Sequence, residues 1–240
     1  MPSSQSRQAE LRALIARPFA HRGLHGHGRP ENSRAAFEAA IGAGHGIELD
    51  VQASADGEAI VLHDYALERL TEGFGAVRSL AAAELKRVHL KGSDETIPTL
   101  AEILALVRGR APMLIEVKSP DRRVAALSRA VQRALDGYDR PVAVMSFNPE
   151  IPHWFAVHAP GRLRGLVISE AGRTWRGILT RRFALWRAHP DFLAYDIRDL
   201  PSRFAGRARA KGLKVLTWTC RTIEDRARAA EHADQIIYEN

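Results

Sequence analysis

Short apolar runs alternate with helix-compatible segments along this 240-residue chain, and that alternation restricts the fold more than any other feature. Eight runs have the length of a buried strand, at residues 18–22, 46–51, 113–118, 142–147, 163–169, 192–196, 214–219 and 235–238. The segments between them favour helices at residues 33–43, 100–107, 124–135, 150–157, 175–188, 202–211 and 222–231. Such repeats predict a closed (β/α)₈ TIM barrel. An open doubly wound sheet is the alternative, but its G-x-G-x-x-G loop is absent after the first strand.

One segment interrupts this alternation and predicts an insertion. Asp56 and Gly57 form a turn signal, a further strand is indicated at 58–63, and a polar segment with three glycines follows at 64–98. Because that segment begins directly after His63, we expect it to fold over the site as a small cap. Length and a hydrophobic fraction of 45% are typical of one globular unit, so we predict a single domain over residues 1–240.

The cysteine content and the N-terminal residues favour a cytoplasmic protein. Cys220 is the single cysteine, which excludes an internal disulfide and a cysteine zinc site. Residues 1–17 carry three arginines and a glutamate among short apolar stretches, so the apolar core of a secretory signal is missing.

The net charge of +7 is concentrated in one part of the chain. Residues 161–215 contain 13 Lys and Arg against four Asp and Glu, which indicates either an anionic partner or a solvated basic surface. A phosphorylated small molecule or an anionic lipid surface would fit this charge. No recognised nucleic-acid-binding motif accompanies it, so we expect no nucleic-acid partner.

The predicted helix at 175–188 is both basic and amphipathic. Its apolar face either packs against the barrel, which is the interpretation we favour, or makes peripheral contact with an anionic membrane. The residues that align on this face are Trp175, Ile178, Leu179, Phe183 and Trp186.

Acidic residues occupy strand positions that a buried strand should avoid. Glu48 and Asp50 are two residues apart and therefore share one face of a strand, while Glu116 belongs to another strand. Uncompensated buried charges cost on the order of several kcal/mol, so these carboxylates need a cation, and they suit Mg²⁺ or Ca²⁺. Alternatively, Glu48 and Asp50 face solvent on an edge strand, and Lys118 neutralises Glu116.

Two histidines stand at strand ends, where the active sites of barrels gather. His21, followed by Arg22, ends the first strand, and His63 ends the additional one. Each alone would be a hydrogen-bonded structural residue, but together beside the acids they can serve as general acid and general base. Arg22 offers a planar fork of donors that matches phosphate oxygens. Phe147 closes another strand, and Trp218 is either core or an aromatic wall of the pocket.

The order and spacing of these motifs resemble the glycerophosphodiester phosphodiesterase family. The resemblance is nearly continuous over residues 21–118 and looser beyond them. The segments that carry it are Ala20-His21-Arg22-Gly23, Pro30-Glu31-Asn32, Ile47-Glu48-Leu49-Asp50-Val51, Asp56-Gly57, Val61-Leu62-His63-Asp64, Ile97-Pro98-Thr99-Leu100 and Ile115-Glu116-Val117-Lys118. Ser146-Phe147 and residues 215–219 look like downstream strand ends of the family.

The resemblance implies a barrel hydrolase that cleaves glycerophosphodiesters to glycerol 3-phosphate and an alcohol. It implies attack by the neighbouring glycerol hydroxyl and a cyclic phosphate that water opens. By position it assigns the divalent ion to Glu48, Asp50 and Glu116, acid/base catalysis to His21 and His63, and phosphate or substrate binding to Arg22, Lys118, Trp218 and Phe147.

Two departures from the family pattern concern the far side of the pocket. Arg221 stands where an Asn commonly follows the Trp-Thr strand, and Tyr238-Glu239-Asn240 replaces a Thr-Asp ending. Arg221 could therefore reach a second anionic group of the substrate. Two alternative functions stay open, a lysophospholipase D-like hydrolase acting on single-chain phospholipids at a membrane surface and a non-catalytic phosphate-binding barrel.

Overall fold

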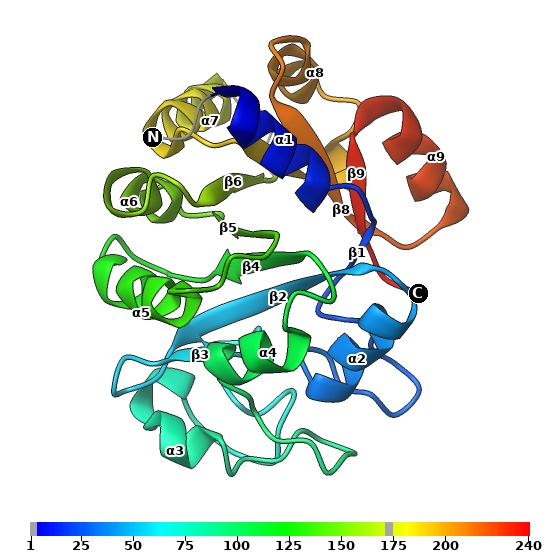
Figure 1. The fold of residues 1–240 in the computed structure, drawn as a ribbon. Coiled ribbons are helices and arrows are strands. Elements are labelled where there is room, and N and C mark those ends of the chain that lie inside the picture. The colour runs from blue at the N-terminus through cyan, green and yellow to red at the C-terminus, as the bar shows by residue number, and fades with distance from the viewer. Residues whose placement is uncertain (1–3, 171–174) are drawn as a thin grey trace.

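Eight parallel strands close into a barrel in the computed structural model, which describes residues 4–170 and 175–240 (Figure 1). Each strand pairs with its neighbour in the chain order, and β1 pairs with both β2 and β9, which closes the ring. The barrel strands are β1 (Phe19–Ala20), β2 (Gly46–Ala53), β4 (Met113–Val117), β5 (Val142–Ser146), β6 (Leu163–Ile168), β7 (Phe192–Asp196), β8 (Lys214–Cys220) and β9 (Gln235–Tyr238). The predicted (β/α)₈ barrel is confirmed.

The helices between the strands cover the outside of the barrel (Figure 1). They are α2 (Arg34–Gly42), α4 (Leu100–Val107), α5 (Ala125–Leu135), α6 (Glu150–His158), α7 (Trp175–Ala188), α8 (Arg203–Ala210) and α9 (Ile223–His232). Each agrees with its predicted range to within one residue at either end. Reciprocal capping boxes at Thr99 and Thr222 begin α4 and α9, because each hydroxyl accepts a hydrogen bond from the backbone N–H three residues later. Among the described residues, no helix is long and apolar enough to cross a membrane.

An additional helix, α1 (Ser4–Leu14), closes the barrel end opposite the strand C-termini. Leu11, Leu14 and Ile15 enter the apolar cluster inside the barrel together with Leu114 of β4. Arg7 anchors the helix through a 2.6 Å hydrogen bond from Nη2 to Asp191 Oδ2. This helix was not among those predicted from the sequence, although the i, i+3, i+4 spacing of Leu11, Leu14 and Ile15 would have indicated it.

The segment after His63 packs beside the barrel on the short strand β3 (Ala59–Val61), which pairs antiparallel with β2. It contains the 3₁₀ turn η1 (Val77–Ser79) and the helix α3 (Ala82–Leu85), and its apolar side chains form a separate cluster with Ile60 and Leu62. Figure 1 shows this segment at one side of the barrel. Its role as a cap stays a prediction.

Helix α7 differs from its predicted packing. The described members of the predicted apolar face, Ile178, Leu179, Phe183 and Trp186, are all exposed, so the expectation that this face packs on the sheet is wrong for them. The side chain of Trp175 lies outside the described part of the chain. Ala184, Leu185 and Ala188 pack on the core instead.

Strand alternation separates an apolar outer layer from a mixed interior. Ile47, Leu49 and Val51 of β2 belong to the cluster between strands and helices. Glu48 and Asp50 therefore point into the barrel. The same alternation in β4 directs Leu114 and Glu116 into the barrel, with Leu114 in the apolar interior and Glu116 nearer the mouth. Glu116 lies beside Asp50, because the two residues are paired in the register of β2 and β4. The barrel interior is thus apolar at its closed end and acidic at its mouth.

Candidate active site

A cluster of three carboxylates lies at the C-terminal end of β2 and β4. One oxygen from each of Glu48, Asp50 and Glu116 lies within 4.8 Å of the others. Burial, together with repulsion from Asp50 and Glu116, raises the pKa of Glu48 well above its ordinary value. Burial and the charge of Asp50 likewise raise the pKa of Glu116 to about 7. A negative charge on both of these carboxyl groups is therefore unfavourable near neutral pH unless a further cation offsets it.

Two cations balance this cluster in part. Lys118 Nζ lies 3.5 Å from Asp50 Oδ1 and 3.3 Å from Glu116 Oε1, and Arg22 Nε lies 3.4 Å from Asp50 Oδ2. Burial alone would raise the pKa of Asp50, but Lys118 and Arg22 outweigh it and hold that pKa below its ordinary value. Lys118 therefore pairs with Glu116, as the alternative interpretation expected, but it also pairs with Asp50.

The cluster fits a hard divalent cation. Glu48 Oε1 is buried and has no hydrogen-bond partner among the described residues. Only two cationic side chains, Arg22 and Lys118, face the three carboxyl groups, and Arg22 also pairs with Glu31 at 2.8 Å. These two side chains therefore do not fully balance the cluster when all three groups are ionised. Carboxylate oxygens at this spacing are the ligands that Mg²⁺ and Ca²⁺ prefer.

The loop after β1 is shaped to hold Arg22 over the acids. Arg22 has a left-handed backbone with φ of 56°, and its N–H donates to Glu48 Oε2 at 3.0 Å. Gly23 follows with φ of 78°, and a Cβ there would meet Ala36 and Phe37 at 2.9 Å, so the tight approach of this loop to α2 requires glycine. The guanidinium Nε of Arg22 is buried and faces Asp50 at 3.4 Å, but it makes no well-aligned hydrogen bond with any residue that the structure describes.

Asn32 orients the second acid. Its amide nitrogen donates to Asp50 Oδ2 at 3.0 Å, and its side-chain oxygen accepts from the backbone N–H of Asp50 at 3.3 Å. Asn32 is itself buried, and its N–H donates to the carbonyl of Arg22. The Pro30-Glu31-Asn32 motif therefore fixes the carboxylate cluster, a role that we had not assigned to it.

His21 is held by a carboxylate from the other end of the chain. Its Nδ1 lies 2.5 Å from Glu239 Oε1, and Arg221 Nε donates to Glu239 Oε2 at 2.7 Å. Burial would raise the pKa of Glu239, but its bonds to His21, His25 and Arg221 hold it far below the ordinary value. An ionised Glu239 only accepts, so Nδ1 of His21 carries the proton and Nε2, 3.9 Å from Glu48 Oε2, is the nitrogen left for chemistry.

His63 has an equivalent partner. Its Nδ1 lies 2.6 Å from Asp64 Oδ1, and Asp64 is also bonded by Arg69, which reaches Glu31 as well. The hydrogen bond from Arg69 lowers the pKa of Asp64 to about 2. Burial lowers the pKa of His63 itself, which favours a neutral imidazole near pH 7. The two histidines are thus each oriented through Nδ1 by an ionised carboxylate.

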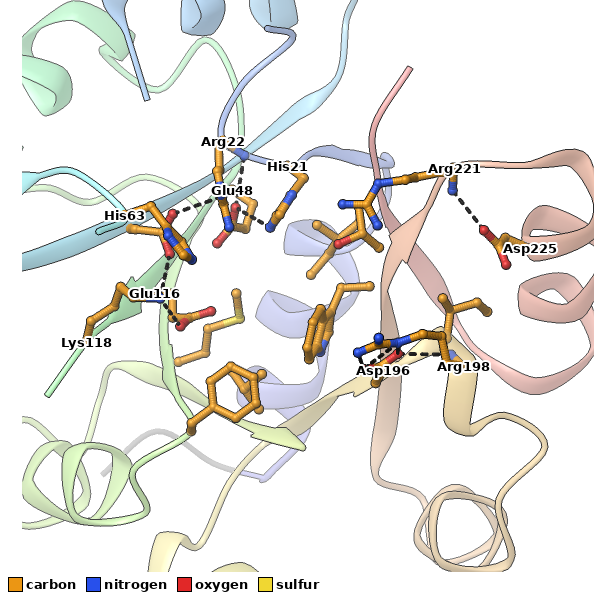
Figure 2. A pocket seen from close by; sticks show the side chains of 18 of the residues that line it. His21, Arg22, Glu48, His63, Glu116, Lys118, Asp196, Arg198, Arg221 and Asp225 are labelled. Atoms are coloured by element: carbon orange, nitrogen blue, oxygen red, sulfur yellow. Dashed lines mark hydrogen bonds and ion pairs between the residues drawn. The ribbon is translucent and has the colours of Figure 1, made fainter. Parts of the chain in front are cut away.

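These groups line one pocket of about 480 Å³ at the barrel mouth. Figure 2 shows His21, Glu48, His63 and Glu116 on one side of it, and Asp196, Arg198, Arg221 and Asp225 on the other. All nine site residues expected from the sequence line this pocket: His21, Arg22, Glu48, Asp50, His63, Glu116, Lys118, Phe147 and Trp218.

An aromatic pair also lines the pocket. Phe147 and Trp218 meet edge to face with ring centroids 5.5 Å apart. Trp218 Nε1 donates to the carbonyl of Ala194 at 3.0 Å, which fixes its ring, whereas the side chain of Phe147 is half exposed. Trp218 is therefore a wall of the pocket rather than only a core residue.

Sequence reasoning missed two residues that position this site. From the sequence, Asn32 was noted only within the family segment Pro30-Glu31-Asn32, and Glu239 only as a departure from a family ending. The signal for Asn32 was its place directly before a helix that follows the His21 strand. Glu239 had no local signal, since its partner is 218 residues away.

Sequence comparison identifies relatives over most of the chain. The model of the glycerophosphoryl diester phosphodiesterase family matches residues 21–237. A glycerophosphodiester phosphodiesterase of Caldanaerobacter subterraneus subsp. tengcongensis is 31% identical over 220 residues, which is 88% of this chain and 88% of the relative. One from Bacillus altitudinis is 40% identical over 142 residues, which is 54% of this chain and 57% of the relative.

Solved structures with the same fold include an Oleispira antarctica phosphodiesterase in complex with the product sn-glycerol-3-phosphate. It superposes with a TM-score of 0.83 at 24% identity, covering 95% of this chain and 94% of that one. A glycerophosphodiester phosphodiesterase of Agrobacterium tumefaciens superposes with a TM-score of 0.70 at 26% identity, covering 92% and 94%.

Proposed function

Since this chain belongs to the glycerophosphoryl diester phosphodiesterase family, we propose that its pocket hydrolyses glycerophosphodiesters to glycerol 3-phosphate and an alcohol with the help of a divalent cation. The observation that carries the proposal is the joint placement of a three-carboxylate cluster and two carboxylate-paired histidines in one pocket. The product bound to the Oleispira antarctica enzyme, which has the same fold, supports glycerol 3-phosphate as the product here.

Glu48, Asp50 and Glu116 would hold the cation, Mg²⁺ or Ca²⁺. When bound, it offsets the negative charge that develops on the phosphoryl oxygens. Arg22 and Lys118, which already contact the acids, would bind the same phosphate, and the Nε of Arg22, which makes no well-aligned hydrogen bond with the described residues, could supply one of the donors.

The two histidines would move the protons. One imidazole removes the proton of the glycerol hydroxyl next to the phosphodiester, and that oxygen attacks phosphorus. The bond from phosphorus to the alcohol oxygen breaks, and the other imidazole protonates the departing oxygen. Water then opens the cyclic phosphate with the two roles exchanged, which returns both histidines to their starting protonation states.

Glu239 and Asp64 act in this scheme as positioning residues. Each holds Nδ1 of its histidine, so that Nε2 is directed to the substrate in the correct tautomer. Residues 64–98 belong to the same proposed domain of residues 1–240 and reach the site through Arg69. The proposal keeps the cytoplasmic location that the single cysteine led us to expect.

The test is release of glycerol 3-phosphate from glycerophosphocholine and glycerophosphoethanolamine, with Mg²⁺, with Ca²⁺ or with chelator. We expect release that chelator abolishes and that one of the two ions restores. Metal binding without turnover of any diester would instead favour the non-catalytic phosphate-binding barrel. Full activity in chelator would exclude the role of the carboxylate cluster.

A second candidate is lysophospholipase D-like hydrolysis of single-chain phospholipids. The half-exposed Phe147 at the pocket favours it, because a lipid substrate needs apolar surface next to the site, and the exposed apolar residues of α7 offer a surface for membrane contact. A lysophospholipid assayed beside the water-soluble diesters separates the candidates. Turnover of the lipid alone would move the function to the membrane.

A further inference from the structure

The outer face of α7 is more apolar than a solvated helix face should be. Ile178, Leu179, Phe183 and Trp186 expose 48%, 54%, 55% and 64% of their surface. At about 100° per residue these positions and Arg182 fall within one sector of the helix. Isolated apolar residues on a surface are ordinary, but an aligned set that includes two aromatics marks a contact surface.

The helix is fixed in this orientation by its polar residues. Arg181 reaches Glu170 and lies over the ring of Phe204 at 6.0 Å, on the side facing α8. Arg187 makes a 2.7 Å ion pair with Glu150 of α6. These two arginines hold α7 against its neighbours, so its apolar face cannot turn inward without breaking both ion pairs.

Helix α5, on the other side of α6, shows the usual arrangement. Its apolar residues Leu127, Val131 and Leu135 are buried against the core. In α7 the apolar side chains that are buried or partly buried are instead Ala184, Leu185 and Ala188, whereas Ile178, Leu179, Phe183 and Trp186 face out. Removing a large apolar side chain from water is favourable, so a partner that covers these four exposed side chains would gain binding free energy from their burial.

The charge of α7 indicates what that partner is. Its sequence WRGILTRRFALWRA contains no acidic residue. Arg182 is exposed in the middle of the apolar face and makes no ion pair with the residues that the structure describes. Aromatic and aliphatic side chains interspersed with arginine on one helix face are typical of helices that lie in the interface of an anionic bilayer.

We propose that the α7 face, defined as Ile178, Leu179, Arg182, Phe183 and Trp186, docks the protein on an anionic phospholipid surface. The apolar side chains enter the headgroup region, and Arg182 pairs with lipid phosphate. Because α7 follows β6, its first turn lies toward the mouth of the barrel. Docking therefore keeps the pocket close to the surface where phospholipid degradation yields phosphodiesters.

The experiment is co-sedimentation of the full chain with vesicles of phosphatidylcholine alone and of phosphatidylcholine with phosphatidylglycerol. We expect binding to the anionic vesicles that weakens as salt increases. The double variant Phe183→Ser, Trp186→Ser should lower the partition coefficient at least about tenfold. Arg182→Glu should weaken binding to anionic vesicles and reduce its salt dependence.

The matched control is Phe74→Ser, which removes a phenylalanine that is 83% exposed in the segment beside β3. It should leave vesicle binding unchanged. Hydrolysis of glycerophosphocholine in vesicle-free solution should be the same for wild type, the α7 variants and the control, because none of these residues lines the pocket.

Three results would overturn the proposal. They are the absence of binding to anionic vesicles, binding that the double variant retains, and a wild-type dimer that the double variant converts to monomer, which would make the face a contact between two copies. Since binding is measured without turnover, failure of the proposed catalytic function would leave this result intact.

Discussion

The two sides of the pocket are built differently. On the side formed by β1, β2 and β4, the charged groups are largely buried and form ion pairs with one another, and Glu48 and Asp50 are each only 1% exposed. On the side formed by β7 and β8, Arg198 and Arg221 have side chains that are 79% and 57% exposed. Both sides carry ion pairs, but water screens those of the second side strongly.

This difference indicates a division of labour. Buried charges that constrain one another keep a fixed geometry, which phosphoryl chemistry requires. Exposed arginines can change partners at little cost, which suits contact with alcohols of different structure. We therefore expect substitutions on the first side to affect the rate of the chemical step and substitutions on the second to affect substrate affinity.

The largest effect should come from Glu48→Ala. Loss of one cation ligand should lower kcat/KM roughly a thousandfold or more, because it removes several kcal/mol of charge stabilisation in the transition state. Calorimetric titration with Mg²⁺ and Ca²⁺ should show weakened binding in a protein that stays folded by circular dichroism. Glu224→Ala, at an exposed position of α9, is the control and should behave as wild type. Unchanged activity of Glu48→Ala would remove the cluster from the mechanism.

His21→Ala and His63→Ala should each lower kcat roughly 10²- to 10⁴-fold while metal binding is retained. A glycerol phosphodiester of 4-nitrophenol distinguishes their roles, because this leaving group departs without protonation. The variant that lacks the general acid should recover much of its rate on that substrate, and the variant that lacks the general base should not. Equal recovery of both variants would contradict the two-histidine scheme.

Glu239→Gln should lower kcat by roughly 10²-fold, less than removal of the imidazole, with a smaller change in KM. The amide can no longer fix the tautomer of His21 through an ionised oxygen, so the pH dependence of kcat should change as well. Glu239→Asp should restore part of the rate. A change in stability without a change in the pH profile would reduce Glu239 to a structural residue.

On the exposed side, Arg198→Ala should raise KM less than about tenfold at unchanged kcat, with an effect that depends on the alcohol. The measurement is a set of Michaelis curves for diesters with neutral, cationic and anionic head groups. An equal fall of kcat for all head groups would show that the two sides do not divide chemistry from affinity.

The smallest expected effect concerns stability in acid. The pKa of Asp64 is lowered from 3.8 to about 2 in the folded protein, so its contribution to stability is fully present above pH 3.8 and is lost as the pH falls toward 2. Because Arg69 is half exposed, the contribution is at most roughly 1 kcal/mol. Asp64→Asn should therefore lower the free energy of unfolding at pH 7 slightly and flatten its decline in acid, as measured by urea titration across this pH range.

Much of the barrel and of the buried side of the pocket could be predicted from the sequence. Strand period and helix period are local properties, so eight apolar runs with intervening helices predicted the barrel. The period of two also placed Glu48 and Asp50 on one face. Residues at the ends of parallel strands meet at one mouth, and this is why the nine expected residues line a single pocket.

The remaining features depend on contacts that only closure of the barrel creates. Pairing of β1 with β9 sets Ala20 opposite Tyr238, and this register brings Glu239 beside His21 although 218 residues separate them. The orientation of α7 was likewise decided by its ion pairs with Glu170 and Glu150, which belong to other parts of the chain. A sequence pattern determines which side chains share a face, but which face is buried depends on the neighbours that tertiary structure supplies.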